Sequence, residues 1–512
     1  MSSEAEREKG ELGERQVSVS SHHIPVEQSN KTFWARLWPV IACGAGLFSD
    51  GYLNAIIGPV NTMLKKLYPH EYASSHATAN VGSITFAGTV LGMLVFGYTS
   101  DKFSRKWSLV ISTCILILFA ILATASYGAG GSINGMLAAL VAYRFFLGIG
   151  IGGEYPAGSV GCAEGTGELK SGTRNKWFIL FTNSMIDIAF VIAALVAMIV
   201  VLATGEDHLR AAWRICLGIG VLPPLSLIYL RVKLQEPEAY KRESMAKTHT
   251  PWLLVLRYYG LRLIVVSIIW FIYDFSAYSF GIYSSSILAN LLGNDTALWK
   301  SLGWNVLLNF FYVPGTIGGA LLSDIPSLNP KRILIIGVTC QAIIGYIMAG
   351  CYEYLDKPKY VAAFVIVYGI FLAFGELGPG NNIGLLASKT SATCIRGQYY
   401  GIAAAMGKIG AFSGGYALTA MQDRYGANGP NPSHSDLIKA GQLPFWVASS
   451  LAIVAAILAY FGLPDVGQDT IDYEDEKFRV YLASHGYDVS KMGLEPTSST
   501  EGLATEEVKP TA

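Results

Sequence analysis

The chain has 512 residues, of which 52% are hydrophobic and only 14% charged, and its formal net charge is zero. An average soluble protein carries roughly 25% charged residues. The composition therefore excludes an ordinary water-soluble globular protein, and the few basic residues of the polar ends give no reason to expect binding to nucleic acid.

Residues 1–33 are polar and include acids. They lack the basic start, short apolar core and cleavage site of a signal peptide. We expect this segment to be a disordered cytoplasmic tail, and we expect the first apolar run after it to direct the chain to the membrane.

Twelve apolar runs follow, each long enough to cross a hydrocarbon core of roughly 30 Å at about 1.5 Å per residue. Open strand edges are not tolerated in lipid and the runs are continuous rather than alternating, so we expect helices. The predicted fold is an all-α membrane protein with twelve transmembrane helices. The runs lie near 34–58, 81–100, 106–126, 134–160, 175–203, 211–231, 258–285, 303–323, 332–351, 360–385, 396–420 and 443–463.

Lysine and arginine are distributed unequally between the two sides of these spans. The turns after even-numbered spans in the first half carry basic clusters, whereas the turns after odd-numbered spans carry few basic residues. By the positive-inside rule both termini are cytoplasmic. We expect a first six-helix bundle at 34–231, a cytoplasmic connection at 232–257, a second bundle at 258–463 and a disordered cytoplasmic tail at 464–512.

Two turns at matching positions resemble each other. GYTSDKFSRK (97–106) follows the second span, and GALLSDIPSLNPKR (319–332) follows the eighth. Each has a glycine, then an aspartate at a helix end, then a basic pair, and charges of this kind interact favourably with helix ends. We predict that these turns latch the cytoplasmic helix ends together, through Gly97, Asp101, Arg105, Lys106 and Asp324.

Charged residues also lie well inside the predicted spans, where a central charge costs roughly 2.5 to 3.5 kcal/mol. One lysine cannot pair with five acids, so several carboxyls must be neutral, hydrated or shared with a substrate. Such carboxyls can load and release protons. The residues are Asp50, Glu154, Asp187, Asp274, Glu376 and Lys408.

Two of these charges can be interpreted in more than one way. Lys408, among the small residues of AAAMGKIGAFSGG (403–415), suits an anion, but a permanent salt bridge to one of the acids would also satisfy it. Asp274 is either a proton or substrate site or a buried structural partner. Trp270, Asp274 and Tyr278 follow at steps of four and therefore share one helix face.

Motifs of enzymes are missing from the sequence. There is no metal-ligand cluster, phosphate-cradling glycine loop or nucleophile elbow, and the seven cysteines are scattered. We therefore expect no metal, no cofactor and no enzymatic activity.

The twelve spans, the matched turns and RFFLGIGIGGEYP (144–156) resemble the major facilitator superfamily over about residues 34–475. This resemblance implies two pseudo-symmetric six-helix bundles that rock about a central substrate site.

A second resemblance is to the phosphate:proton symporters. It rests on the pattern WxxxDxxxY at 270–278, on GGEY (152–155) and on AAMGK (404–408). It implies that Asp274 lies near the ligand and titrates, with Asp50 and Glu154 as further proton-coupling acids. The residues that it implies as phosphate ligands are Tyr155, Trp270, Tyr278 and Lys408.

The departures from that family are informative. Glu376 in FGELGPGNN (374–382) stands where phosphate symporters have asparagine, and Asn183 stands where they present a glutamine to the ligand. A fixed negative charge beside a phosphate would repel it, unless the carboxyl is protonated or faces another part of a larger substrate.

Segments along the whole chain resemble the fungal glycerophosphodiester permeases, among them LFSDGYLNA (47–55), GPGNNIG (378–384) and SHGYDVSKMGLE (484–495). The resemblance implies a monomeric, proton-coupled importer of glycerophosphoinositol or glycerophosphocholine in the plasma membrane. Its partners would be an anionic small molecule, protons and membrane lipid, with the proton gradient in place of any cofactor. An inorganic phosphate symporter and a nutrient receptor that does not transport remain alternatives.

Overall fold

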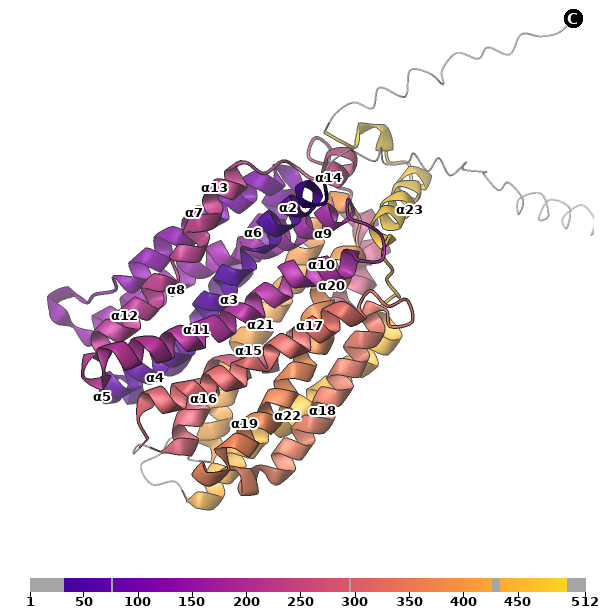
Figure 1. The fold of residues 1–512 in the computed structure, drawn as a ribbon. Coiled ribbons are helices and arrows are strands. Elements are labelled where there is room, and N and C mark those ends of the chain that lie inside the picture. Colours follow the sequence, from indigo (N-terminus) through magenta and orange to yellow (C-terminus); the bar gives the residue numbers. More distant parts are fainter. Residues whose placement is uncertain (1–31, 75–76, 294–295, 426–432, 495–512) are drawn as a thin grey trace, which may run out of the picture.

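The computed structural model describes residues 32–74, 77–293, 296–425 and 433–494. The predicted N-terminal tail, 1–33, thus lies almost wholly outside the described residues. Within them the chain is helical, without a strand (Figure 1).

The first half of the chain forms six crossings, and all but the second and third are broken into shorter helices. Its elements are α2 (Phe33–Gly44), α3 (Leu47–Ala55), α4 (Ile57–Leu67), α5 (Pro69–Ser74), α6 (Ala77–Lys102), α7 (Arg105–Thr124), η1 (Ala129–Gly131), α8 (Ile133–Gly153), η2 (Glu154–Ser159), α9 (Val160–Thr166), α10 (Arg174–Phe181), α11 (Asn183–Thr204), η3 (Glu206–His208), α12 (Leu209–Ile219) and α13 (Leu222–Val232).

The second half begins after a short connecting helix and contains six further crossings. Its elements are α14 (Glu238–Glu243) in the connection, α15 (Trp252–Leu292), α16 (Leu298–Phe310), α17 (Tyr312–Leu322), α18 (Pro330–Leu355), η4 (Pro358–Tyr360), α19 (Val361–Gly375), η5 (Glu376–Gly380), α20 (Asn381–Lys389), η6 (Thr393–Ile395), α21 (Arg396–Arg424), α22 (His434–Gly462), α23 (Thr470–Ser484) and η7 (Val489–Lys491).

Eleven helical segments of the described chain are long and apolar enough to cross a membrane. The predicted span 396–420 is not among them, although it forms the 29-residue helix α21. This helix packs against α6 and α15, so protein rather than lipid covers much of it. Its glycines, lysine and arginines are therefore tolerated, and the twelve predicted crossings are all present as helices.

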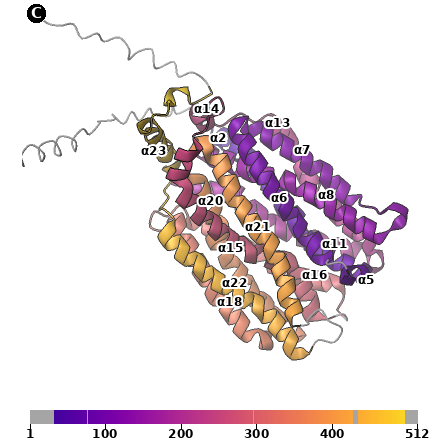
Figure 2. The same ribbon diagram turned by 180° about the vertical axis from the view of Figure 1, so that it is seen from behind.

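The two halves lie side by side, with α6 against α21 and with α10 and α11 against α17 and α16 (Figures 1 and 2). Glycines allow the backbones to approach closely at these crossings. A Cβ on Gly401 of α21 would lie 2.6 Å from the carbonyl oxygen of Met93 on α6, and one on Gly97 would lie 2.9 Å from that of Gly397. Any larger side chain would push the halves apart.

One end of the molecule carries both α14 and α23, and we call it the tail face; α5 lies at the opposite end, the far face (Figure 1). The prediction of a disordered tail is wrong for the described part of 464–494. Helix α23 packs its Phe478 ring on Tyr258 and Tyr259 of α15, with centroids 5.6 and 5.1 Å apart, and buries Leu482 completely. This apolar contact supplies the stability that the polar composition did not suggest.

Candidate functional site

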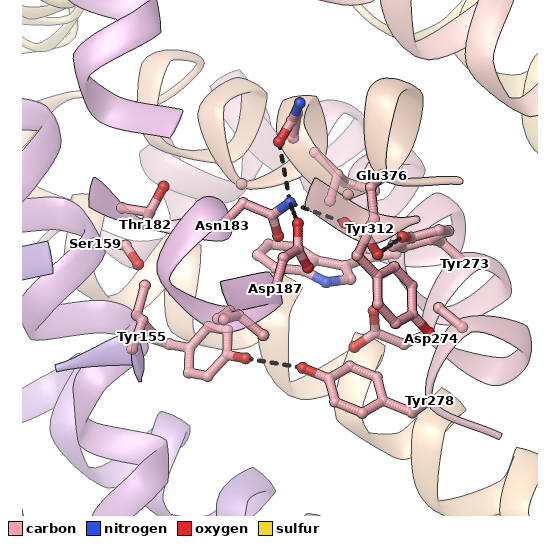
Figure 3. A pocket seen from close by; sticks show the side chains of 18 of the residues that line it. Tyr155, Ser159, Thr182, Asn183, Asp187, Tyr273, Asp274, Tyr278, Tyr312 and Glu376 are labelled. Carbon is pink, nitrogen blue, oxygen red and sulfur yellow. Dashed lines mark hydrogen bonds between the residues drawn. The ribbon is translucent and has the colours of Figure 1, made fainter. Parts of the chain in front are cut away.

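A cavity of about 700 Å³ lies between the two halves, and residues of both halves line it (Figure 3). All seven residues that were predicted to bind substrate line this cavity, while their binding of a substrate stays a prediction. Its polar and aromatic lining residues are Tyr155, Ser159, Phe178, Thr182, Asn183, Asp187, Phe190, Trp270, Tyr273, Asp274, Tyr278, Tyr312, Glu376, Asn381, Tyr400 and Lys408.

Two π-helical turns at matching places shape the cavity. In the fourth crossing of each half, the α-helix changes to a π-helix at η2 (sequence EYPAGS) and η5 (sequence ELGPG). Each turn contains a proline, which has no N–H to continue the α-helical ladder. Tyr155 and Ser159 of η2, and Glu376 and Gly380 of η5, thereby line the cavity.

Lys408 defines one end of the cavity, the basic end. Its Nζ lies 3.2 Å from Asp274 Oδ2 and 3.7 Å from the centre of the Tyr278 ring. Trp270, on the same helix as Asp274, also lines the cavity. No other lysine or arginine of the described residues lines the cavity. An anion that enters must therefore join or replace the Asp274 carboxylate at the ammonium group.

Asp50 lies behind the cavity wall rather than in it. Its carboxylate accepts hydrogen bonds from the Tyr155 hydroxyl at 2.5 Å and from Asn54 Nδ2 at 2.5 Å. The hydroxyls of Tyr155 and Tyr278 are 3.2 Å apart, and since Tyr155 donates to Asp50, Tyr278 is the donor between them. Asp50 is thus connected to the basic end through two tyrosines.

A second group of lining residues, which we call the acidic end, holds two carboxylates around one amide. Asn183 Nδ2 lies 2.8 Å from Glu376 Oε2 and 3.3 Å from Asp187 Oδ2 (Figure 3). The Tyr273 hydroxyl donates to Glu376 Oε1 at 2.6 Å. Asp187 comes from the first half and Glu376 from the second, so the two halves meet at this amide.

Glu154 does not line the cavity and has a cation of its own. Arg231 donates to both of its carboxylate oxygens at 2.5 Å, and the same guanidinium donates to Thr113. Both partners are nearly inaccessible to solvent. Arg231 is the last residue of the predicted span 211–231, and its side chain reaches back among the helices. The proton-coupling role of Glu154 stays a prediction, now with Arg231 as its partner.

Arg144 is a second buried cation that the sequence analysis overlooked. It lies inside the predicted span 134–160, and its guanidinium donates to the carbonyl oxygens of Val81 at 2.9 Å and Leu53 at 3.3 Å. The expectation that one lysine faces five acids is therefore wrong for the bundle as a whole. In the cavity, Lys408 faces three of the five acids, namely Asp187, Asp274 and Glu376.

A cluster of charges joins the halves at the tail face. Asp101 accepts hydrogen bonds from the backbone N–H groups of Gly397 at 2.9 Å and Gln398 at 2.8 Å, at the start of α21. Arg105 bonds Asp101 at 2.5 Å and Glu164 at 3.0 Å. An acid at a helix N-terminus is electrostatically favourable, so this contact holds α6 against α21.

The second matched turn makes a weaker contact of the same kind. Asp324 accepts hydrogen bonds from the Lys176 backbone N–H of α10 at 3.3 Å and from Gln468 Nε2 at 2.8 Å. Burial raises the pKa of this carboxyl, and the bond from Gln468 opposes the shift. Lys106 forms no ion pair within the described chain, and its ammonium lies over the Trp107 ring, 5.6 Å from the centre.

The far face also carries contacts between the two halves. Glu206 pairs with Lys66 of its own half and accepts a hydrogen bond from the Leu298 N–H of the second half at 2.6 Å. Tyr416 donates to Asn80 Oδ1 at 2.7 Å, again across the halves. The described residues therefore make contacts between the halves at both faces.

Comparison with known proteins agrees with this geometry. The family model described as "Sugar (and other) transporter" matches residues 38–243 and 234–478. The chain is 47% identical over 486 residues to the major glycerophosphoinositol permease GIT3 of Candida albicans, which covers 93% of this chain and 88% of that protein. It is also 47% identical to the glycerophosphocholine permease GIT4 of the same organism, covering 89% and 84%.

Among solved structures, the proton:xylose symporter XylE has the same fold, with a TM-score of 0.68, 17% sequence identity, and coverage of 86% of this chain and 98% of that one. Fold and site thus define a membrane transporter of the major facilitator superfamily, and not an enzyme. Within that class, the chain belongs to the Sugar (and other) transporter family and groups with the glycerophosphodiester permeases of fungi.

Proposed function

We propose that this chain is a proton-coupled symporter that imports glycerophosphodiesters across the plasma membrane by alternating access. The tail face is cytoplasmic, so both termini are cytoplasmic, and the transporter acts as a monomer with the proton gradient as its driving force. The printed names of the relatives at 47% identity, a glycerophosphoinositol and a glycerophosphocholine permease, support this substrate class.

The pairing of Lys408 with Asp274 in the cavity wall carries the proposal. A phosphodiester has a single negative charge, which one ammonium group can balance. Tyrosine and tryptophan combine a hydrogen-bond donor with an apolar surface, so Tyr155, Trp270 and Tyr278 suit the phosphate and the glycerol carbon atoms.

The same pair supplies a means of proton coupling. When the substrate takes the place of Asp274 at Lys408, the Asp274 carboxylate loses its counter-charge in a buried environment. The protonated form of Asp274 then has the lower free energy. Substrate and proton then bind together. Asp50, connected through Tyr155 and Tyr278, is the acid to which the proton can pass next.

Size and charge favour a diester over inorganic phosphate. The cavity lining extends from Lys408 and Asp274 to Asp187, Glu376 and Tyr312, which is more than phosphate alone would contact. The carboxylates of the acidic end would also repel a second negative charge, whereas the neutral or cationic head group of a diester can contact them.

Uptake of labelled glycerophosphoinositol, glycerophosphocholine and phosphate, in cells that lack carriers of their own, tests the proposal. We expect at least one of the two diesters to accumulate against its concentration gradient, and we expect phosphate to accumulate poorly. Accumulation of phosphate alone would support an inorganic phosphate symporter. Saturable binding without accumulation would indicate a receptor.

A further inference from the structure

The acidic end of the cavity points to a particular kind of head group. We propose that Asp187, together with Glu376, forms a subsite for a cationic head group, so that a zwitterionic diester with an ammonium group is preferred over the inositol diester. The inference rests on the proposed function, and it assigns to Asp187 a role in substrate choice.

The first observation is the absence of a counter-charge. Within the described chain, neither Asp187 nor Glu376 has a lysine, arginine or histidine nitrogen within ion-pair distance, although both are more than nine-tenths buried. Asn183 gives one amide group to both carboxylates. Since buried carboxylates without a cation are costly, a ligand that brings a positive charge gains most here.

The second observation is an unused hydroxyl beside aromatic rings. Tyr312 lines the cavity at 4% exposure, and its hydroxyl has no hydrogen-bond partner among the described residues (Figure 3). The Tyr312 ring packs against the Phe190 ring, with centroids 5.6 Å apart. A third ring, that of Tyr273 on α15, lies beside Glu376. Aromatic rings and carboxylates together are the surroundings that bind quaternary ammonium groups.

The third observation is the polarity of the whole cavity. Its one ammonium group, on Lys408, pairs with Asp274, whereas Asp187 and Glu376 share the Asn183 amide instead of a cation. A zwitterionic diester has the complementary order, with phosphate toward Lys408 and ammonium toward the acidic end. An inositol head group can donate hydrogen bonds to the carboxylates, but it leaves their charges uncompensated.

The position of the two acids adds a consequence for transport. Asp187 belongs to α11 of the first half and Glu376 to η5 of the second. A cation between them attracts both halves at once, and it therefore favours the occluded arrangement over either open one.

Competition during uptake tests the subsite. The uptake of labelled glycerophosphocholine is measured in the wild type, Asp187→Asn and Asp187→Glu. Unlabelled choline, ethanolamine and inositol diesters are added in turn as competitors. Ser184→Ala is the matched control, because Ser184 lies on the same helix and bonds Thr316 but does not line the cavity. Surface expression is measured for every variant.

We expect the wild type to bind the choline and ethanolamine diesters more tightly than the inositol diester. Asp187→Asn should weaken both ammonium diesters about tenfold or more, with the inositol diester changed less than about threefold, since the charge-assisted contact alone is lost. Asp187→Glu should retain the preference of the wild type.

An equal loss for all three diesters in Asp187→Asn, or an unchanged order of preference, would overturn the subsite while leaving diester transport intact. Uptake of no diester by the wild type would overturn the proposed function itself. If Asp187→Asn fails to reach the surface, the thermal stabilisation of the purified wild-type protein by each diester tests the subsite instead. Stabilisation at lower concentrations of the choline diester than of the inositol diester supports the subsite, and the reverse order refutes it.

Discussion

Lys408 supplies the positive charge of the described cavity wall, so its removal is the most direct test of the anion site. Lys408→Ala should weaken every phosphodiester, whatever its head group. Loss of a charge-assisted bond to a desolvated anion costs roughly 1.5–3 kcal/mol, which corresponds to about tenfold or more in affinity. The measurement is the concentration dependence of uptake at matched surface expression.

Ser413→Ala is a suitable control for Lys408→Ala, because Ser413 lies on the same helix and bonds only backbone oxygens of α21. If Lys408→Ala keeps a near-normal affinity, then Lys408 serves as the structural partner of Asp274, as the alternative interpretation of the sequence has it.

Glu376 separates this cavity from that of a plain phosphate carrier. Glu376→Gln removes the charge but keeps an acceptor for the Tyr273 hydroxyl, so it should weaken a choline diester by about tenfold and an inositol diester by less than about threefold. Glu376→Asn restores the residue of the phosphate symporters, and inorganic phosphate should then compete. Competition of each unlabelled ligand against labelled substrate measures both effects.

The same order of preference in the wild type and in both Glu376 variants would show that Glu376 does not contact the head group. Glu376 would then belong with the proton-handling acids.

The cavity residues were predictable where the sequence carries a local rule. Trp270, Asp274 and Tyr278 at steps of four share a face, and all three line the cavity. The partner of Glu154 was not predictable, because Arg231 is 77 residues away and sits at the end of its helix, where a solvated position is the usual one. Arg144, by contrast, was open to prediction, since it lies inside a span whatever its partner.

At the scale of helices, α23 shows how far a polar composition can mislead. The segment TIDYEDEKFRVYLAS reads as charged, but Ile471, Phe478 and Leu482 recur at helical spacing and are buried. That spacing could have predicted an amphipathic helix. Its docking place could not be predicted, because Thr393, Arg396 and Tyr259 come from distant parts of the chain.

The docking of α23 should depend on pH through Asp475. Burial raises the pKa of this carboxyl to about 6, against the opposing effects of Arg396 and the hydrogen bonds from Thr393. Because its pKa is raised, Asp475 binds a proton more tightly when α23 is docked than when α23 is undocked. The contribution to docking is therefore fully present below the ordinary pKa of aspartate and is lost as the pH rises through about 6.

Helix α23 should accordingly be better protected at pH 5.5 than at pH 7.5, by on the order of 1 kcal/mol. Amide hydrogen exchange of residues 470–484, corrected for intrinsic rates, measures the difference. Asp475→Asn keeps an acceptor for Thr393 and should abolish most of the pH dependence. Equal corrected protection at both pH values in the wild type would contradict the assignment.

For the whole molecule, the contacts between the halves at both faces define what each step of the proposed alternating-access cycle must break. Opening at the tail face separates Asp101 from the start of α21, and opening at the far face separates Glu206 from the start of α16. Both contacts join a carboxylate to the backbone N–H of a helix start in the other half. The chain thus uses comparable contacts at its two ends, which suits the proposed alternation between them.

Proton coupling is the prediction that involves the whole cycle. Three carboxylates and one ammonium group line the described cavity, so a substrate anion adds to an excess of negative charge unless a proton enters with it. Uptake should therefore rise as the external pH falls toward about 5, and a protonophore should abolish accumulation against a gradient.

Asp274→Asn cannot bind and release the proton at Lys408, so we expect it to exchange labelled for unlabelled diester without concentrating either. The measurement is accumulation and exchange of labelled diester at several external pH values, with and without protonophore. Undiminished accumulation in the absence of a proton gradient, driven instead by sodium, would show that the buried carboxylates of the cavity serve another purpose.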